Sequence, residues 1–182
     1  MKFEQTPLEG AFLIEPKVFG DERGFFMENW NAQTFREAGL DLDFVQDNRS
    51  RSEQGILRGM HYQTQHTQGK LVSVSAGEVF DVIVDLRQSS PTLGQWFGAL
   101  LNEQNHRMLW VPPGFAHGFY VCSDYADFAY KCTDFYHPKS EVSLAWDDPT
   151  VNIDWPLSDS RSPQLSAKDL QGRAWENIPL FD

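Results

Sequence analysis

The sequence predicts an all-β protein, built as an antiparallel sandwich or barrel. Short β-rich runs follow one another along the 182 residues, and no long helical segment lies between them. Turn signals such as Ser90-Pro91 and Asp148-Pro149 separate these runs. Strands at this spacing are typical of sandwiches and barrels. A chain of this length is expected to form one domain, residues 1–182.

The N-terminal part of the chain is expected to hold two strands and one short helix. Residues 11–16 form a β-rich run, and residues 24–30 form an aromatic one. Residues 31–39 are expected to form the helix, because Asn31 can cap its first turn and Gly39 can end it.

The rest of the chain is expected to be mainly strands. Residues 57–63 and 68–72 are interpreted as two neighbouring strands, and residues 72–76 alternate apolar with polar side chains. Residues 79–86 form an apolar run interrupted by two aspartates, as expected for a largely buried strand. Residues 158–166 look loop-like. Further strands are expected at residues 96–101, 107–111, 118–121, 126–133 and 141–146.

The composition argues against several classes of protein. The formal net charge of -11 disfavours nucleic acid or an anionic membrane as a partner, because both attract basic patches. Cys122 and Cys132 are the only cysteines, so no disulfide framework is expected. The N-terminus has no apolar leader, and no stretch is long enough to span a membrane. We therefore expect a cytoplasmic protein.

One short segment carries the residue types of proton-transfer chemistry. Arg58, His61 and Lys70 fall within thirteen residues. Histidine suits proton transfer near neutral pH, and lysine can stabilise a developing negative charge. Arginine can bind a carboxylate or phosphate through two hydrogen bonds. The segment predicts proton abstraction next to a carbonyl of an anionic substrate.

Other candidate residues are ambiguous when each is considered alone. His61 and His117 both lie beside glycine and aromatic residues, and they could be two ligands of a metal site, which needs several converging ligands. Tyr130 and Tyr136 have an even spacing, which would put them on one face of a strand that continued that far. Asp169 would alone be interpreted as an exposed charge.

Taken together, the order and spacing of a series of segments resemble the dTDP-4-dehydrorhamnose 3,5-epimerase family, whose members are sugar-nucleotide enzymes. The matching segments run from residue 16 to residue 169, and no single one of them is decisive. They are PKVFGDERGFF at 16–26, FVQDN at 44–48, LRGMHYQ at 57–63, QGKLV at 68–72, GEVFDV at 77–82, DLR at 85–87, PGFAHGF at 113–119, WDDP at 146–149, DWP at 154–156 and LSAKD at 165–169.

The resemblance implies a fold and a set of roles. The fold would be a cupin-type double-stranded β-helix, a jelly-roll sandwich with short peripheral helices. His61 would be the base, oriented by Asp169, and Tyr130 the proton donor on the other face of the sugar. Lys70 would face the C4 oxygen, and Tyr136 would stack on thymine. The other positions implied to contact the substrate, as Lys70 does, are Arg23, Glu28, Gln46, Asp47, Asn48, Arg58, His117, Glu141 and Lys168.

The implied reaction is 3,5-epimerisation of dTDP-4-dehydro-6-deoxy-D-glucose to dTDP-4-dehydro-L-rhamnose through C4 enolates, in dTDP-L-rhamnose biosynthesis. A ketone at C4 acidifies the hydrogens on C3 and C5, so the isomerase is expected to need no cofactor. Metal-binding cupins usually carry a close His-x-His pair followed by Glu, which this chain lacks, so no metal is expected. A homodimer is expected, with no nucleic acid and no membrane as partner.

Two alternatives stay open from the sequence. A single-centre epimerase, acting at C3 or C5, or a ketoisomerase on a related dTDP-4-keto sugar would keep His61 but place the acid elsewhere. A non-catalytic or metal-binding cupin that senses a sugar would lack the pairing of a base with an acid.

Overall fold

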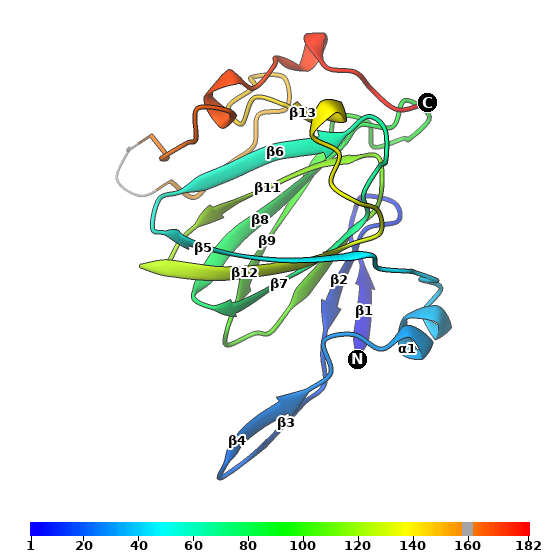
Figure 1. Cartoon of the computed structure of the whole chain (residues 1–182), viewed down its shortest axis with the longest axis vertical. Helices are drawn as coiled ribbons and strands as arrows, with labels where there is room; N and C mark the ends of the chain where they lie inside the picture. Colours follow the sequence, from blue (N-terminus) through cyan, green and yellow to red (C-terminus); the bar gives the residue numbers. More distant parts are fainter. Residues whose placement is uncertain (158–161) are drawn as a thin grey trace.

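The computed structural model describes residues 1–157 and 162–182, and it confirms the all-β class. Two antiparallel sheets pack face to face as a jelly-roll sandwich (Figure 1). The loop predicted at residues 158–166 lies partly outside the described residues. No helix in the described ranges is both long and apolar enough to cross a membrane.

The larger sheet contains six strands, which come from both halves of the chain. They are β1 (Lys2–Gln5), β2 (Phe12–Glu15), β5 (Gln46–Glu53), β7 (Lys70–Ala76), β10 (Met108–Val111) and β12 (Tyr125–Cys132). Their spatial order is β1-β2-β10-β7-β12-β5.

The smaller sheet contains five strands. They are β6 (Leu57–Gln63), β8 (Glu78–Asp85), β9 (Trp96–Asn102), β11 (Phe115–Val121) and β13 (Glu141–Ser143). Their order is β13-β6-β11-β8-β9, so β6 and β7, which follow each other along the chain, lie in opposite sheets. We interpreted residues 57–63 and 68–72 as neighbouring strands. They are consecutive strands along the chain, but they are not neighbours in one sheet.

Apolar side chains fill the space between the sheets and cover the outer face of the smaller one. The inner core includes Val72, Val74, Phe119 and Phe128. On the outer face, residues of β6, β8 and β11 pack under the C-terminal segment, which carries the short 3-10 helices η3 (Asp169–Gln171) and η4 (Trp175–Asn177). A third 3-10 helix, η1 (Pro138–Ser140), precedes β13.

The predicted helix is present as α1 (Ala32–Glu37). The side chain of Asn31 accepts hydrogen bonds from the backbone amides of Gln33 and Thr34, which satisfies two amides of the first turn. Gly39 follows the helix with a φ of 87°, a conformation that favours glycine. The helix buries Phe35 beneath the larger sheet's outer face, beside Ile14 and Leu71.

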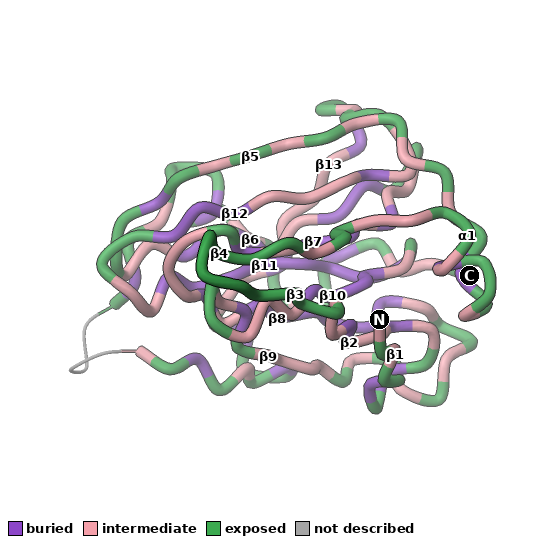
Figure 2. Tube along the Cα trace, turned by 90° about the horizontal axis from the view of Figure 1, so that it is seen from below, coloured by how far each residue is buried: buried purple, intermediate pink, exposed green. Residues whose placement is uncertain are grey.

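A two-stranded hairpin, β3 (Val18–Asp21) with β4 (Gly24–Met27), projects away from the sandwich (Figure 1). Nearly all of its residues are exposed, as the tube in Figure 2 shows along both strands. Its apolar side chains Phe19, Phe25 and Phe26 are 53%, 61% and 66% exposed. An apolar surface of this size outside the core requires an explanation.

Candidate active site

A β-bulge in β6 positions His61. His117 on β11 pairs with His61, and Phe119 pairs with Arg58, so β6 carries one more residue than β11 between these pairs. The extra residue interrupts the alternation of side chains along the strand, and bulges of this kind often redirect a side chain beside an active site. His61 is thereby turned toward the interior, whereas Met60 and Tyr62 belong to the outer apolar cluster.

Two glycines allow the bulge to pack against β11. A Cβ added at Gly59, which has a φ of 129°, would lie 2.5 Å from the Cα of Gly118. A Cβ added at Gly118 would lie 2.6 Å from the sulfur of Met60. The backbones of β6 and β11 can approach this closely only because neither residue has a side chain.

His61, which is partly exposed, forms a dyad with the buried Asp169 at the start of η3. The Nε2 of His61 lies 2.6 Å from Oδ1 of Asp169. The hydroxyl of Ser166 donates to the other carboxylate oxygen at 2.7 Å. Burial alone would raise the pKa of Asp169, but the hydrogen bonds from His61 and Ser166 outweigh it, and the pKa is lowered. Asp169 is therefore a buried carboxylate, and its interpretation as an exposed charge is wrong.

Lys70 and Tyr130 approach His61 from the opposite sheet. On β7, Lys70 precedes Val72 by two residues, and on β12 Tyr130 follows Phe128 by two. Since side chains two residues apart share a face of a strand, and both Val72 and Phe128 belong to the inner core, Lys70 and Tyr130 point inward. A histidine from one sheet thus faces a tyrosine and a lysine from the other.

Two cavities, of about 310 Å³ and about 290 Å³, meet at these side chains. Both are lined by His61, Lys70, His117 and Tyr130. The first extends to Tyr136 and Glu141, and the second extends to side chains beneath β6 and η3. A substrate in either cavity would therefore contact the same four groups.

Burial shifts the pKa values of the two groups on the larger sheet in opposite directions. Loss of hydration lowers the pKa of Lys70, and nearby acidic groups oppose this only in part. Burial raises the pKa of Tyr130, so its hydroxyl stays protonated well above neutral pH. Lys70 forms no salt bridge with any other residue that the structure describes, so its ammonium group can respond to a charge on a ligand.

A second histidine–aspartate pair lies beside the first. The Nε2 of His117 is 2.9 Å from Oδ2 of Asp81, and Asp81 is fully buried on β8. Burial raises the pKa of Asp81, although His117 and Lys70 act to lower it. Asp81 was not among the residues predicted from the sequence. The sequence does show Asp81 as a charged residue within the apolar run 79–86. Its pairing with His117, however, is visible only in the folded sheet.

The rim of the first cavity is a chain of polar contacts. The hydroxyl of Tyr136 donates to Glu141 at 2.6 Å, and Lys168 lies 2.5 Å from the same carboxylate. Burial would raise the pKa of Glu141, but the hydrogen bonds from Lys168 and Tyr136 lower it, and the bond to Glu141 raises the pKa of Tyr136 to about 12. The side-chain oxygen of Gln46 accepts a hydrogen bond from the backbone amide of Tyr136 at 2.9 Å. These contacts fix an exposed aromatic ring at the mouth of the cavity.

Of the other residues predicted to contact the substrate, some line the two cavities and some do not. Asn48 lines the first cavity, and Arg58 lines the second, where its Nε donates to Ser52 at 2.9 Å. Asp47, by contrast, is exposed on the opposite face of β5 and bound to Lys131 at 2.8 Å. The structure therefore brings most of the predicted contact residues to the two cavities but leaves Asp47 outside them.

Arg23 and Glu28 also lie away from both cavities. Arg23 is at the tip of the β3–β4 hairpin, where it pairs with Asp21. The carboxylate of Glu28 accepts a hydrogen bond from Asn31 at 2.9 Å. Within one chain, neither side chain lines the cavities that contain His61.

A metal site was one interpretation of His61 and His117. Residues 1–157 and 162–182 contain no group of three or more histidine, cysteine, aspartate or glutamate side chains that could hold a metal ion. Each of the two histidines instead binds one buried aspartate.

The fold and this site fit one class of enzyme, the isomerases built on a jelly-roll sandwich. Residues 5–177 match the family described as dTDP-4-dehydrorhamnose 3,5-epimerase. A protein of that description from Pseudomonas aeruginosa is 53% identical over 182 residues, which cover 100% of this chain and 99% of that one. The chain belongs to the dTDP-4-dehydrorhamnose 3,5-epimerase family.

Solved structures agree with this assignment and with the cupin-type jelly-roll fold. The dTDP-6-deoxy-D-glucose-3,5-epimerase of Legionella pneumophila, in complex with dTDP-4-keto-L-rhamnose, has a TM-score of 0.94 and 55% identity, over 98% of this chain and 94% of that chain. A 3'-monoepimerase from Streptomyces bikiniensis, in complex with dTDP-quinovose, has a TM-score of 0.86 and 33% identity, over 93% of this chain and 85% of that chain.

Proposed function

We propose that the protein catalyses 3,5-epimerisation of dTDP-4-dehydro-6-deoxy-D-glucose to dTDP-4-dehydro-L-rhamnose. The observation that carries this proposal is the placement of His61 and Tyr130 on opposite sheets, with one cavity space between them. Inversion of a carbon requires removal of a proton from one face and delivery of a proton to the other. A base and an acid on facing sheets meet that requirement.

The first step is removal of a proton by His61. Because its Nε2 bonds to Asp169, the other ring nitrogen is the one available to accept a proton. In the D-gluco configuration the hydrogens on C3 and C5 are axial on the same face of the ring, so one base can reach both. The electrons of each broken C–H bond move to the C4 oxygen and form an enolate.

Lys70 and Tyr130 complete the reaction. The ammonium group of Lys70 stabilises the negative charge on O4 only once the enolate develops, and such stabilisation accelerates the step. Tyr130 then donates its proton to the carbon from the opposite face. Solvent returns a proton to Tyr130 and removes one from His61, so each inversion consumes and produces no net proton.

The diphosphate of the substrate accounts for the cationic side chains around the cavities. The protein carries a net charge of -11, yet Arg58 and Lys168 line the second cavity, in addition to Lys70, which is assigned to O4. Among the described residues, Arg58 forms no salt bridge, so its guanidinium can bind a phosphate. The exposed ring of Tyr136 at the cavity mouth is placed to stack on the thymine base.

Incubation with the 4-keto sugar nucleotide in deuterated water tests the function directly. We expect deuterium at both C3 and C5 of the L-rhamno product, measured by nuclear magnetic resonance. Dialysis against a chelator should leave the rate unchanged, since the proposed steps use no metal. Label at one carbon only would identify a single-centre epimerase, and no label would overturn the proposed chemistry.

Replacement of Asp169 by Asn tests the dyad. The amide keeps the shape of the carboxylate but cannot stabilise the imidazolium, so kcat should fall roughly ten- to a hundredfold, the value of one charge-assisted hydrogen bond. A wild-type rate between pH 6 and 8, roughly the range in which histidine titrates, would contradict the assignment of Asp169.

The lowered pKa of Asp169 also has a consequence for stability. A lowered folded-state pKa stabilises the fold above the ordinary aspartate value of about 4, and this contribution is lost as the pH falls below it. The stability difference between wild type and Asp169→Asn should therefore be largest near neutrality and shrink in acid, as measured by thermal unfolding.

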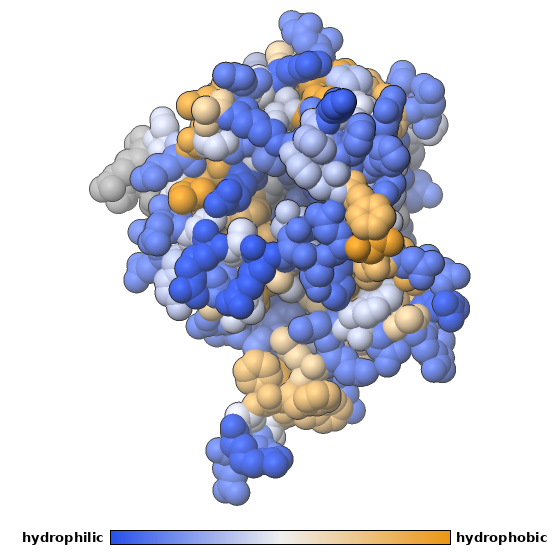
Figure 3. Space-filling view, viewed as in Figure 1, coloured by the Kyte–Doolittle hydropathy of each residue, from blue (hydrophilic) through white to orange (hydrophobic). Residues whose placement is uncertain are grey.

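The exposed hairpin supports the further proposal that the enzyme is a homodimer. Its phenylalanines form an apolar patch above a charged tip in the space-filling view (Figure 3). Arg23 and Glu28, which family resemblance assigns to substrate contact, lie on or just after this hairpin, outside the cavities of their own chain. Docking of the hairpin on a second copy would bury the patch and bring these side chains to the second copy's site.

A mixing experiment tests this arrangement. His61→Ala and Arg23→Ala variants should each be impaired, but a mixture allowed to exchange subunits should recover up to about a quarter of the wild-type activity, because half of the dimers would each hold one intact site. No recovery would place Arg23 in its own chain's site.

Phe26→Ser should lower the mass measured by analytical ultracentrifugation, whereas Leu93→Ser, at an exposed apolar residue outside the hairpin, should not.

A further inference from the structure

The C-terminal residues form part of the active-site wall. The backbone amide of Phe181 donates to the carbonyl of Leu86 at 3.0 Å, and the amide of Gln88 donates to the carbonyl of Phe181 at 2.8 Å. Phe181 thus extends the end of β8 as an isolated parallel bridge. The hydroxyl of Tyr62, the residue after His61, donates to the carbonyl of Pro179 at 2.8 Å. The tail is tied to two strands of the catalytic sheet.

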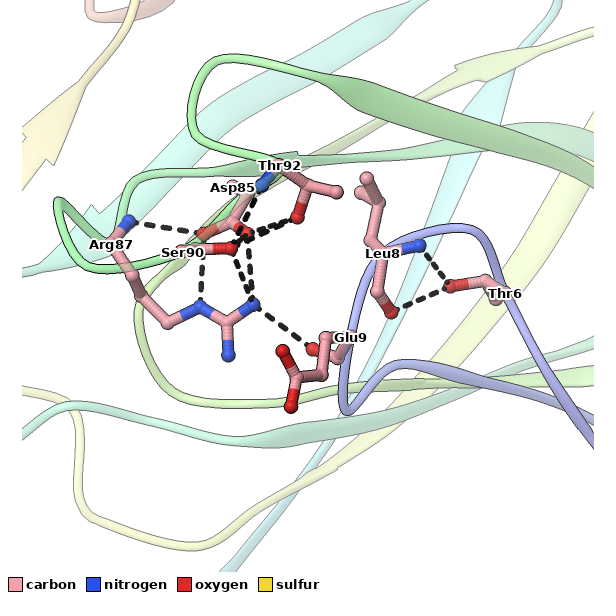
Figure 4. A network of polar contacts seen from close by, with 7 residues as sticks. All are labelled: Thr6, Leu8, Glu9, Asp85, Arg87, Ser90 and Thr92. Carbon is pink, nitrogen blue, oxygen red and sulfur yellow. Dashed lines mark hydrogen bonds and ion pairs between the residues drawn. The ribbon is translucent and has the colours of Figure 1, made fainter.

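A polar network around the buried Asp85 holds the strand end to which Phe181 binds. Figure 4 shows Arg87 and its partners. Its guanidinium donates to the fully buried Asp85 at 2.8 and 2.9 Å and to the carbonyl of Glu9 at 3.0 Å. The hydroxyls of Ser90 and Thr92 donate to the same carboxylate at 2.6 and 2.7 Å. This network fixes the backbone on both sides of the bridge to Phe181.

The same arginine joins the tail to the floor of the first cavity. Its guanidinium lies 4.6 Å from the ring centre of Phe115. A Cβ added at Gly114 would lie 2.7 Å from the Cγ of Arg87 and 4.0 Å from the ring of Phe181, so the glycine allows these groups to close on the loop. Gly114, Phe115, Phe181 and Tyr62 all line the first cavity.

We propose that Phe181 determines substrate specificity: with Val111 and Phe115 it forms an apolar wall that receives a methyl group of the nucleotide sugar. This proposal rests on the proposed function. The rest of the cavity is lined mainly by polar side chains, among them Gln46, Asn48 and Gln68. Val111, Phe115 and Phe181 supply its wholly apolar side chains, and Phe181 reaches Gly114, the neighbour of Phe115. An apolar wall favours an apolar ligand group, because contact removes both surfaces from water.

The proposed substrate carries two methyl groups, C6 of the sugar and the methyl on C5 of thymine. Calorimetric titration with two ligand pairs distinguishes them. dTDP and dUDP differ by the thymine methyl, and dTDP-6-deoxy-D-glucose and dTDP-D-glucose differ by a hydroxyl on C6. Wild type should prefer the methyl-bearing member of one pair by about tenfold, a typical value for one methyl in a fitted pocket.

Phe181→Ala should reduce that preference to near parity and leave the preference within the other pair unchanged. Phe181→Leu, which keeps the apolar character and the backbone pairing, should give an intermediate ratio. It also keeps the test valid if the alanine variant fails to fold. Unchanged ratios in both variants would overturn the proposal.

Leu180→Ala is the matched control. Leu180 precedes Phe181 on the same tail and packs on the same outer cluster, but it does not line the cavity. Its loss should lower the unfolding temperature and leave both ligand ratios as in wild type. Wild-type turnover of the 4-keto sugar, measured in parallel, separates the two ideas. Failure of turnover would count against the proposed function, and intact turnover with unchanged ratios would count only against the role of Phe181.

Discussion

His61→Ala should abolish deuterium wash-in at C3 and at C5 together. His61 is the residue that the proposed mechanism uses as base at both carbons, and its ring nitrogen is held by Asp169 in the common wall of the two cavities. Removal of a general base typically slows turnover by about 10²–10⁴-fold. The measurement is the rate of label incorporation at each carbon, followed by nuclear magnetic resonance.

His66→Ala provides the control for this variant. His66 is a half-exposed histidine in the loop after β6, paired with Asp134 at 3.5 Å, and it lines neither catalytic cavity. The His66→Ala variant should exchange the substrate hydrogens on C3 and C5 at the wild-type rate. If His61→Ala also exchanged C3 and C5 at near the wild-type rate, another group would have to be the base, and the mechanism would be wrong.

Tyr130→Phe should uncouple exchange from inversion. The change removes one hydroxyl and little volume, and it leaves His61 and Lys70 in place. The enolate should still form, and His61 should return a proton or deuteron to the face from which it came. We expect the variant to keep solvent exchange in recovered substrate while losing most of the inverted product, about 10²-fold or more for loss of a general acid.

Tyr136→Phe is the comparison for this second variant. It breaks the 2.6 Å hydrogen bond to Glu141 but keeps the aromatic ring at the cavity mouth. Stacking on thymine should survive, with a modest rise in KM and little change in kcat. If Tyr136→Phe lost inversion while Tyr130→Phe made L-rhamno product at the normal rate, the two roles would be reversed.

Local signals explain which elements were predictable from the sequence. The cap at Asn31 and the glycine at 39 bound α1 because both act on the backbone next to them. β8 was evident because burial on both faces imposes an apolar run. β5 was not predicted, since its sequence QDNRSRSE is polar throughout. It is an edge strand whose pairing with β12 is set by the sheet and not by its own composition.

The site was predictable where chemistry is carried by residue type, and unpredictable where it depends on contacts distant in the sequence. The even spacing of Tyr130 and Tyr136 suggested one strand, but β12 ends at Cys132, so Tyr136 lies beyond the strand, where its hydroxyl donates to Glu141. The burial of Asp169 and the partner of Asp81 follow from long-range packing. The last residues carried no motif, because Phe181 reaches the cavity through backbone pairing.

The placement of the proposed base, His61, and the proposed acid, Tyr130, on separate sheets makes the apolar layer between the sheets a spacer. Facing sheets lie about 10 Å apart, a distance set by the side chains that interdigitate between them. Phe128, two residues before Tyr130, stacks on Phe119 of the opposite sheet with ring centres 4.1 Å apart. The stacked rings of Phe128 and Phe119 therefore help to set the distance between the two sheets, and a sugar ring must fit within that distance. In the proposed mechanism, the stereochemical outcome therefore depends on core packing as well as on His61 and Tyr130.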